Sequence, residues 1–283
     1  MIEKAAAKYY GNYENMEGGN MVESLYMLTG MPTKSLSTSS LSAADLWTQI
    51  KELDDAQYPM TASNPRPVHG LPGGHAYTLL GVPKLNDGTK MVKIRNPWGS
   101  EDYTGPYSDG KLTTAQKTEL GHVSKDDGVF FMDIATFQAD FSDVQFALYE
   151  DWTVDTQEAT WDRTTADISN LSWTVLNSKT QDVVVNVDMV NKRHFPRGCS
   201  SADMPEYQFF HVKGSDGRRM TDRYGSTYSY TGGNGKGYLF FKDLPEGEVT
   251  FEIFNAGYAP SHSGTAHFTV NAFGKDGQVT LHK

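Results

Sequence analysis

Apolar and polar residues alternate along two neighbouring stretches in the first half of the chain. Residues 76–82 (AYTLLGV) and 90–94 (KMVKI) each predict a β-strand, and the Asn-Asp-Gly sequence at 86–88 favours a tight turn between them. The pattern therefore predicts a β-hairpin. Because antiparallel strands bring the start of one beside the end of the other, His75 and Asn96, which flank the hairpin, are expected to be neighbours.

The rest of the first 150 residues mixes helical spacing with short alternating runs. Apolar residues three or four positions apart predict helices, and Ser42 with Asp45 three residues later marks the start of one of them. Helices are expected at 2–10, 21–28, 42–53, 111–120 and 134–141, strands at 58–62, 128–132 and 144–149, and an exposed loop over the Ser/Thr-rich residues 32–41. This part of the chain is expected to be α+β, with a mostly antiparallel sheet.

From about Trp152 the pattern changes to strands alone. Runs of β-branched and aromatic residues are separated by Gly, Asn, Asp and Pro, which is typical of an antiparallel β-sandwich. Strands are expected at 173–176, 182–189, 207–212, 237–242, 248–254, 265–271 and 278–282. The sequence therefore predicts two domains, residues 1–150 and 151–283.

Composition excludes several classes of protein. A hydrophobic content of 38% is typical of globular domains, whereas no apolar run reaches the roughly 18 residues that a membrane span needs, and the N-terminus has no signal-peptide pattern. We expect a soluble, cytoplasmic protein. The net charge of −10 argues against a nucleic-acid partner, and the single cysteine, Cys199, excludes an internal disulfide.

The ends of the predicted hairpin carry the candidate chemistry. In cysteine proteases an imidazole takes a proton from a thiol while an asparagine amide holds the imidazole in place, and His75 and Asn96 are these two residue types. Pro97 is expected to end the second strand and present Asn96 at the sheet edge, and Trp98 to keep water from the His–Asn hydrogen bond. Each residue alone also fits a structural role. His69 is a weaker candidate base, because no predicted strand holds it.

Several motifs resemble the second half of the calpain protease core, a papain-like cysteine peptidase fold. They are GGHAYTLLG, KIRNPWG and EDYTGPYSD, with EKAAAKYYGNYENMEGGN before them and DDGVFFMDIATF after them, in the family's order over about residues 1–150. The resemblance implies that His75 is the general base and acid, that Asn96 orients it and that Trp98 shields the pair. It also implies a papain-like half-core acting on protein substrates.

The same resemblance implies a missing partner for these residues. The family's nucleophilic cysteine lies in a preceding subdomain, whereas Cys199 follows the histidine and falls in the sandwich region. Cys199 is therefore not expected to replace it, and the chain alone is predicted to be inactive. Loss of half of the cleft also predicts an apolar face through which the chain forms a homodimer.

A calcium site is also implied by the resemblance. Its ligands would be the carboxylates of Asp102, Asp109 and Asp127 and a backbone carbonyl near Lys125. Val129 stands where the family has an acidic ligand, which predicts weaker calcium binding unless Glu101 or Asp126 compensates. Calcium is therefore an open expectation.

The sandwich region resembles the C2-like domain that follows the calpain core. The likeness is carried by WTVLNSKTQDVVVNVDMVNKRHF and LPEGEVTFEIFNAGYAPSHSGTAHFTV. It implies a phospholipid surface as a partner, and a purely structural scaffold is the alternative. Together these features predict a fragment of a calcium-regulated cysteine endopeptidase. The alternative is a non-catalytic calpain-like regulatory or membrane-adaptor protein.

Overall fold

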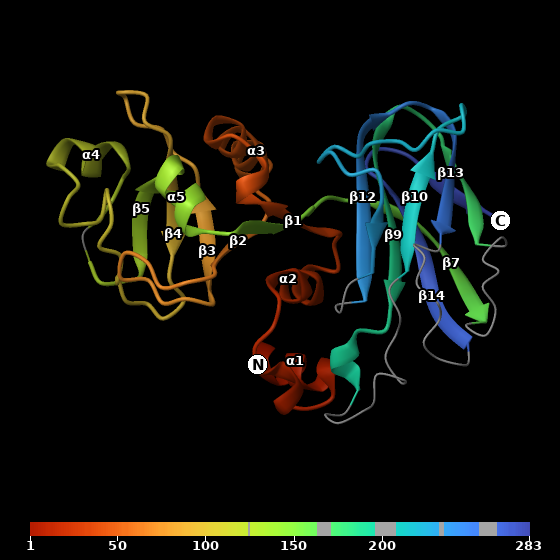
Figure 1. Ribbon diagram of the computed structural model, residues 1–283, viewed down its shortest axis with the longest axis horizontal. Helices are drawn as coiled ribbons and strands as arrows, with labels where there is room; N and C mark the ends of the chain where they lie inside the picture. Colours follow the sequence, from red (N-terminus) through yellow and green to blue (C-terminus); the bar gives the residue numbers. More distant parts are fainter. Residues whose placement is uncertain (124, 163–170, 196–207, 232–234, 255–264) are drawn as a thin grey trace. The chain divides into compact units, whose positions relative to one another are not determined.

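The computed structural model describes residues 1–123, 125–162, 171–195, 208–231, 235–254 and 265–283 (Figure 1). Contacts divide the chain into two compact units, which we call the α+β unit, Ser24–Tyr149, and the β-rich unit, Met1–Glu23 with Glu150–Lys283. The first 23 residues thus group with the later part of the chain. The predicted domains 1–150 and 151–283 stay a prediction.

The α+β unit is built on a six-stranded sheet in which every neighbouring pair of strands is antiparallel. The strand order is β1-β6-β2-β3-β4-β5. The strands are β1 (Thr33–Ser37), β2 (Met60–Asn64), β3 (His75–Gly81), β4 (Met91–Arg95), β5 (Val129–Asp133) and β6 (Asp143–Ala147). Because β3 and β4 lie side by side within this sheet, the residues at their ends are held by strands on both sides.

The predicted hairpin is formed by β3 and β4. Thr78 lies opposite Arg95, so the start of β3 and the end of β4 meet at the same end of the hairpin. In the connecting turn the Leu85 N–H donates to the Thr89 carbonyl at 2.9 Å, and Gly88 takes a φ of 93°, which glycine adopts without steric cost. Local turn chemistry therefore sets the ends of these two strands.

Two of the helices in this part of the chain pack on the sheet, and each begins after a residue whose side chain accepts from its first N–H groups. The helices are α2 (Met21–Thr29), α3 (Ala43–Asp55), α4 (Thr114–Glu119) and α5 (Ile134–Asp140), with a short 3₁₀ turn η2 (Thr38–Ser40). The Ser42 side chain accepts from the Asp45 N–H at the start of α3, and Asp133 caps α5 in the same way. Helices α3 and α5 contact each other, while α3 contacts β3 and α5 contacts β4 and β5.

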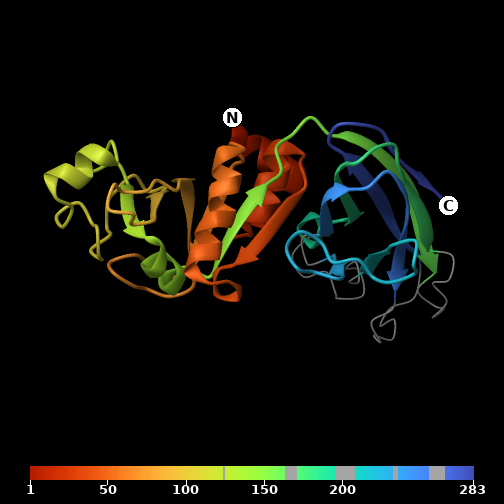
Figure 2. The same ribbon diagram turned by 90° about the horizontal axis from the view of Figure 1, so that it is seen from above.

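The β-rich unit consists of two antiparallel sheets around one core (Figure 1 and Figure 2). One sheet has the order β11-β10-β13-β8-β15 and the other β12-β9-β14-β7. The strands are β7 (Thr153–Asp162), β8 (Ser172–Asn177), β9 (Gln181–Met189), β10 (Phe209–Lys213), β11 (Ser229–Tyr230), β12 (Lys236–Leu244), β13 (Gly247–Phe254), β14 (Thr265–Gly274) and β15 (Val279–His282).

Alternate residues of these strands fill the space between the two sheets. Val183, Val185 and Val187 of β9 are buried in the same cluster as Trp173 and Phe251 of the opposite sheet. An α+β part followed by all-β antiparallel sheets confirms the predicted fold class.

Residues at the N-terminus pack within the β-rich unit. Helix α1 (Ile2–Tyr10) and the 3₁₀ turn η1 (Glu14–Met16) lie against a second 3₁₀ turn, η3 (Lys192–His194). Arg193 Nε forms an ion pair with Glu23 Oε2 at 2.8 Å, and its guanidinium donates to the Asn15 carbonyl at 2.7 Å. The guanidinium also lies over the Tyr10 ring. One arginine therefore joins several separate parts of this unit.

Two predictions of secondary structure were wrong. Residues 32–41 are not an exposed loop, because Thr33–Ser37 pair with β6 and Leu36 is buried. The ten-residue strand β7 was not predicted, since its residues are mostly polar and it is recognisable only from its pairing with β14. Both strands owe their conformation to a partner distant in sequence. The predicted strand at 207–212 is described only from residue 208.

Candidate active site

The two residues predicted to be neighbours form a hydrogen bond. His75 opens β3 and Asn96 follows β4, and His75 Nε2 lies 3.0 Å from Asn96 Oδ1. Asn96 is fully buried, so its amide cannot exchange this partner for water. The Tyr77 ring lies edge-on to the imidazole, with 4.7 Å between centroids. The imidazole is therefore held from two sides.

The position of Asn96 depends on a close approach by the backbone of the DDG turn. The Asn96 N–H donates to the Gly128 carbonyl at 2.9 Å. Gly128 has a φ of 81°, and a Cβ there would lie 2.6 Å from the Asn96 carbonyl oxygen. Only glycine fits both the backbone conformation and the space. The glycine of this turn therefore allows the strand end that carries Asn96 to sit where it does.

Trp98 lies against the catalytic candidate but is only partly covered itself. Its ring is tilted by 46° to the His75 ring, with 4.4 Å between centroids, and 64% of the residue is exposed. Its backbone N–H donates to Asn96 Oδ1 at 3.1 Å. The indole therefore packs on the imidazole, and the predicted shielding of the His–Asn hydrogen bond stays a prediction.

His69, the weaker candidate base, has a different partner. Its Nδ1 lies 2.7 Å from Oδ2 of Asp140, a buried residue at the end of α5. Its carbonyl accepts from the Thr104 N–H at 2.8 Å. Among the described residues, no contact joins His69 to His75. Because 71 positions separate His69 from Asp140, no local signal in the sequence announces this pair.

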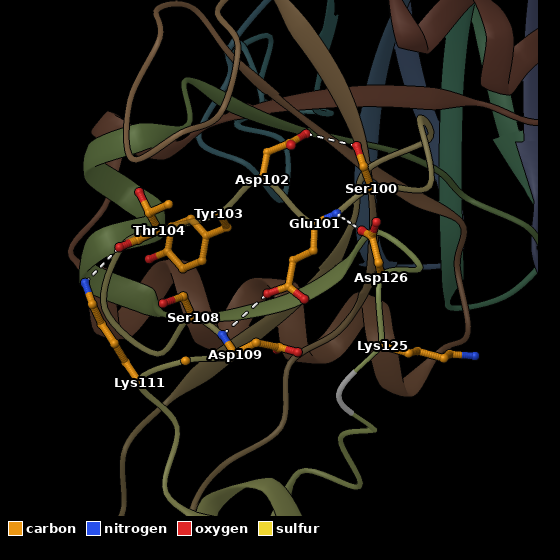
Figure 3. A pocket seen from close by; sticks show the side chains of 11 residues that line it. Ser100, Glu101, Asp102, Tyr103, Thr104, Ser108, Asp109, Lys111, Lys125 and Asp126 are labelled. Carbon is orange, nitrogen blue, oxygen red and sulfur yellow. Dashed lines mark hydrogen bonds between the residues drawn. The ribbon is translucent and has the colours of Figure 1, made fainter.

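Two of the three aspartates assigned to a calcium site line an open pocket beside the hairpin (Figure 3). The pocket is lined by Ser100, Glu101, Asp102, Tyr103, Thr104, Ser108, Asp109, Gly110, Lys111, Lys125 and Asp126. Figure 3 shows the Lys125 side chain extending away from the carboxylates of Glu101 and Asp109. The structure thus brings Asp102 and Asp109 to one pocket, while Asp127 is not among the residues that line it.

Each of the three aspartates already has protein partners. Asp102 Oδ2 accepts from Asn96 Nδ2 and Ser100 Oγ. Asp127 accepts from Lys125 Nζ at 3.0 Å and from the Val129 N–H at 3.0 Å, and these bonds lower the pKa of its carboxyl. Both cations and N–H groups therefore occupy oxygens that a metal would need.

Asp109 is paired with a residue that the sequence analysis did not single out. Its Oδ1 lies against Nε2 of His122, whose side chain is only 2% exposed, although the geometry is not that of a directed hydrogen bond. The Asp109 N–H also lies 3.4 Å from Glu101 Oε1. Burial, with the neighbouring carboxylates of Asp109 and Asp126, raises the pKa of Glu101 to about 7.

These residues do not fit a calcium ion as they are arranged. Calcium takes six to eight oxygen ligands at about 2.3–2.6 Å, yet the described residues contain no group of three His, Cys, Asp or Glu side chains placed to hold a metal. Val129 adds no carboxylate. Binding would require Lys125 and His122 to release the aspartates that they contact, so the calcium site stays a prediction.

A histidine bonded to a buried asparagine amide, with an indole packed on the imidazole, is the arrangement that the base half of a cysteine-peptidase site requires. The family model described as calpain family cysteine protease matches residues 1–148. The chain belongs to the calpain family.

Curated relatives match about half of the chain. The calpain-type cysteine protease DEK1 of Arabidopsis thaliana is 35% identical over 160 residues, which is 51% of this chain and 7% of that protein. Calpain-9 of Rattus norvegicus is 29% identical over 170 residues, covering 51% of this chain and 23% of that protein. Calpain-9 of Homo sapiens is 29% identical over 198 residues, or 58% and 27%. The chain therefore spans about a quarter or less of the length of these relatives.

Two further predictions concern Cys199 and membrane-spanning segments. Cys199 lies outside the described residues. Of the helices that the structure describes, none has the length and apolar character needed to cross a lipid bilayer.

Proposed function

We propose that the α+β unit carries the histidine and asparagine half of a calpain-type cysteine endopeptidase site, which acts on protein substrates when a thiol from outside these 283 residues completes it. The observation that carries the proposal is the 3.0 Å bond between His75 Nε2 and Asn96 Oδ1 in a chain of the calpain family. The chain is then a fragment of the complete enzyme.

The geometry supports separate tasks for the two imidazole nitrogens. An amide oxygen accepts a hydrogen bond, so Nε2 carries the proton and Nδ1 is left to take one from the thiol. The resulting thiolate would attack the carbonyl carbon of the scissile peptide bond. His75 would return the proton to the leaving amine, and water would then release the acyl group from sulfur. Asn96 would keep the ring in the orientation that both transfers need.

Calcium regulation stays part of the proposal for the complete enzyme, although Asp109 and Asp127 contact His122 and Lys125 in this structure. We propose further that the thiol is not that of Cys199, because in the resemblance the nucleophile precedes the histidine in the chain. The β-rich unit would serve as a scaffold or docking domain of the same enzyme.

The proposal is tested with the chain as it stands and with a longer product of its gene. The 283-residue chain should not hydrolyse a fluorogenic peptide, and Cys199→Ala should change nothing. The coding sequence before Met1 should specify a glutamine and a cysteine at a helix start. A longer chain containing them should hydrolyse casein, and His75→Ala should abolish this while Cys199→Ala does not.

Results of two kinds would overturn the proposal. One is hydrolysis by the 283-residue chain that Cys199→Ala abolishes, or by the longer chain after His75→Ala. The other is a residue without a thiol at the helix start, which would favour the non-catalytic regulatory or membrane-adaptor protein.

A further inference from the structure

Asp102 lies next to the His75–Asn96 pair and contacts the side of the amide that the histidine does not. Its Oδ2 atom lies 3.3 Å from Asn96 Nδ2 and 3.1 Å from Ser100 Oγ. The other amide atom, Asn96 Oδ1, faces His75 Nε2 at 3.0 Å and the Trp98 N–H at 3.1 Å. The Asn96 amide thus has an acceptor beside its nitrogen and a backbone donor beside its oxygen.

This arrangement permits only one orientation of the amide. An ionised carboxylate can only accept a hydrogen bond, and a backbone N–H can only donate one. If the Asn96 amide turned over, its oxygen would face the Asp102 carboxylate and its NH₂ group would face the Trp98 N–H. Both contacts would be repulsive, and because Asn96 is fully buried, no water could replace them.

The orientation of the amide in turn selects the tautomer of the histidine. With Oδ1 facing it, His75 Nε2 must carry the proton, and Nδ1 is unprotonated in the neutral ring. We propose that Asp102 is a positioning residue for the peptidase reaction: by holding the Asn96 amide in one orientation, it keeps His75 in the tautomer that can accept a proton at Nδ1. The inference rests on the proposed function for the role of His75.

The backbone at Asp102 is itself held by the turn that precedes β3. Gly70 packs so closely that a Cβ there would lie 2.1 Å from the Asp102 carbonyl oxygen, and Gly70 has a φ of 84°. On the same turn, the His69 carbonyl accepts from the Thr104 N–H at 2.8 Å, and the His69 ring bonds to the buried Asp140 at 2.7 Å. The turn therefore braces the loop that presents Asp102.

The negative charge of the Asp102 carboxylate also acts on Tyr77, which contacts the His75 ring. Burial, followed by the charge of Asp102, raises the pKa of the Tyr77 phenol to about 12. The Tyr77 ring lies edge-on to His75, so the Asp102 carboxylate acts on both Tyr77 and Asn96, the two residues that hold the imidazole.

The test measures the tautomer of His75 in the 283-residue chain by nuclear magnetic resonance. Protein labelled with ¹⁵N in histidine is observed at alkaline pH, where the ring is neutral, and the ring nitrogen shifts give the ratio of the Nε2–H to the Nδ1–H form. Asp102→Ala removes the acceptor, and Asp102→Asn keeps the shape of the side chain. Ser100→Ala is the matched control, because it removes the other donor to Oδ2 and leaves the acceptor in place.

We expect the wild-type protein and Ser100→Ala to show the Nε2–H form. In Asp102→Ala and Asp102→Asn the ratio should fall by about fivefold, since one hydrogen bond no longer distinguishes the two amide orientations. In protein labelled with ¹⁵N in asparagine, the side-chain NH₂ signal of Asn96 should shift in both variants. If Asp102→Ala does not fold, Asp102→Asn gives the answer by itself.

Two other results separate the possible errors. If wild type shows the Nε2–H form and the Asp102 variants keep the wild-type ratio, the positioning role is wrong while the proposed function stands. If the wild-type ring is in the Nδ1–H form, Nδ1 cannot accept a proton, and the proposed function itself is wrong.

Discussion

Replacing Gly128 by alanine should disturb the site through the backbone alone. The added Cβ would lie 2.6 Å from the Asn96 carbonyl oxygen and 3.2 Å from the Gly99 Cα. Both contacts are with backbone, so neither can be relieved by a side-chain rotation. The turn must therefore move, which strains or breaks the 2.9 Å bond from the Asn96 N–H to the Gly128 carbonyl.

A second glycine of the same unit separates this clash from ordinary backbone strain. Gly121 has a φ of 60°, and a Cβ there would meet nothing within 4 Å. Gly121→Ala should therefore cost only the left-handed conformation, about 1–2 kcal/mol. Gly128→Ala should cost that amount plus the damaged hydrogen bond and the shift of the turn, about 3 kcal/mol in total.

Calorimetry of the full chain measures the difference. At about 4 °C per kcal/mol for a unit of this size, Gly121→Ala should lower the Tm of the α+β unit by about 6 °C and Gly128→Ala by about 12 °C. The ring ¹⁵N signals of His75 should shift in Gly128→Ala and stay in place in Gly121→Ala. Equal Tm values for the two variants, with unshifted His75 signals, would refute the argument that Gly128 positions Asn96.

Three further outcomes follow from charged groups. Because burial raises the pKa of the Glu101 carboxyl from 4.5 to about 7, the folded state keeps a proton that the unfolded state has lost. The stability that this group contributes should therefore fall as the pH rises from 4.5 to 7. Glu101→Gln should remove this part of the dependence of Tm on pH, whereas Glu248→Gln, which changes an exposed residue of β13, should not. An unchanged pH dependence in Glu101→Gln would contradict the raised pKa of Glu101. Isothermal titration should show no saturable calcium heat up to about 1 mM, and a saturable heat would show that the pocket rearranges to bind the ion. Arg193→Ala should destabilise the β-rich unit by about 3 kcal/mol in urea unfolding, because it removes the ion-pair partner of the nearly buried Glu23. Arg218→Ala, which removes a side chain that is 88% exposed, should unfold like wild type. Similar losses of stability in both variants would exclude a specific role for Arg193.

The main parts of the site could be predicted because they depend on short-range features of the chain. The turn at 86–88 and the alternation on either side of it predict the hairpin, and the antiparallel pairing then brings His75 to Asn96. Helix α3 could be predicted in the same way, from the cap at Ser42 and the spacing of its apolar residues. Motifs in these segments also carried the resemblance to the calpain family, which the comparison over residues 1–148 shows.

Other parts of the fold are visible only once the sheet has formed. The polar strand Thr33–Ser37 has no strong preference of its own and becomes extended by pairing with β6, more than 100 positions away. The mostly polar strand β7 is likewise fixed by its ten-residue pairing with β14.

The sequence by itself determined the hairpin, the two residues at its ends and the family to which they point. Tertiary structure decided what surrounds them: Asp102 beside the Asn96 amide, and the His122 and Lys125 side chains against the other aspartates of the expected calcium site. A motif identifies a carboxylate as a candidate ligand. Whether its oxygens face a metal, a cationic side chain or an amide depends on how separate loops pack against one another. The arrangement that leaves the fewest buried polar groups without a hydrogen-bond partner has the lowest free energy.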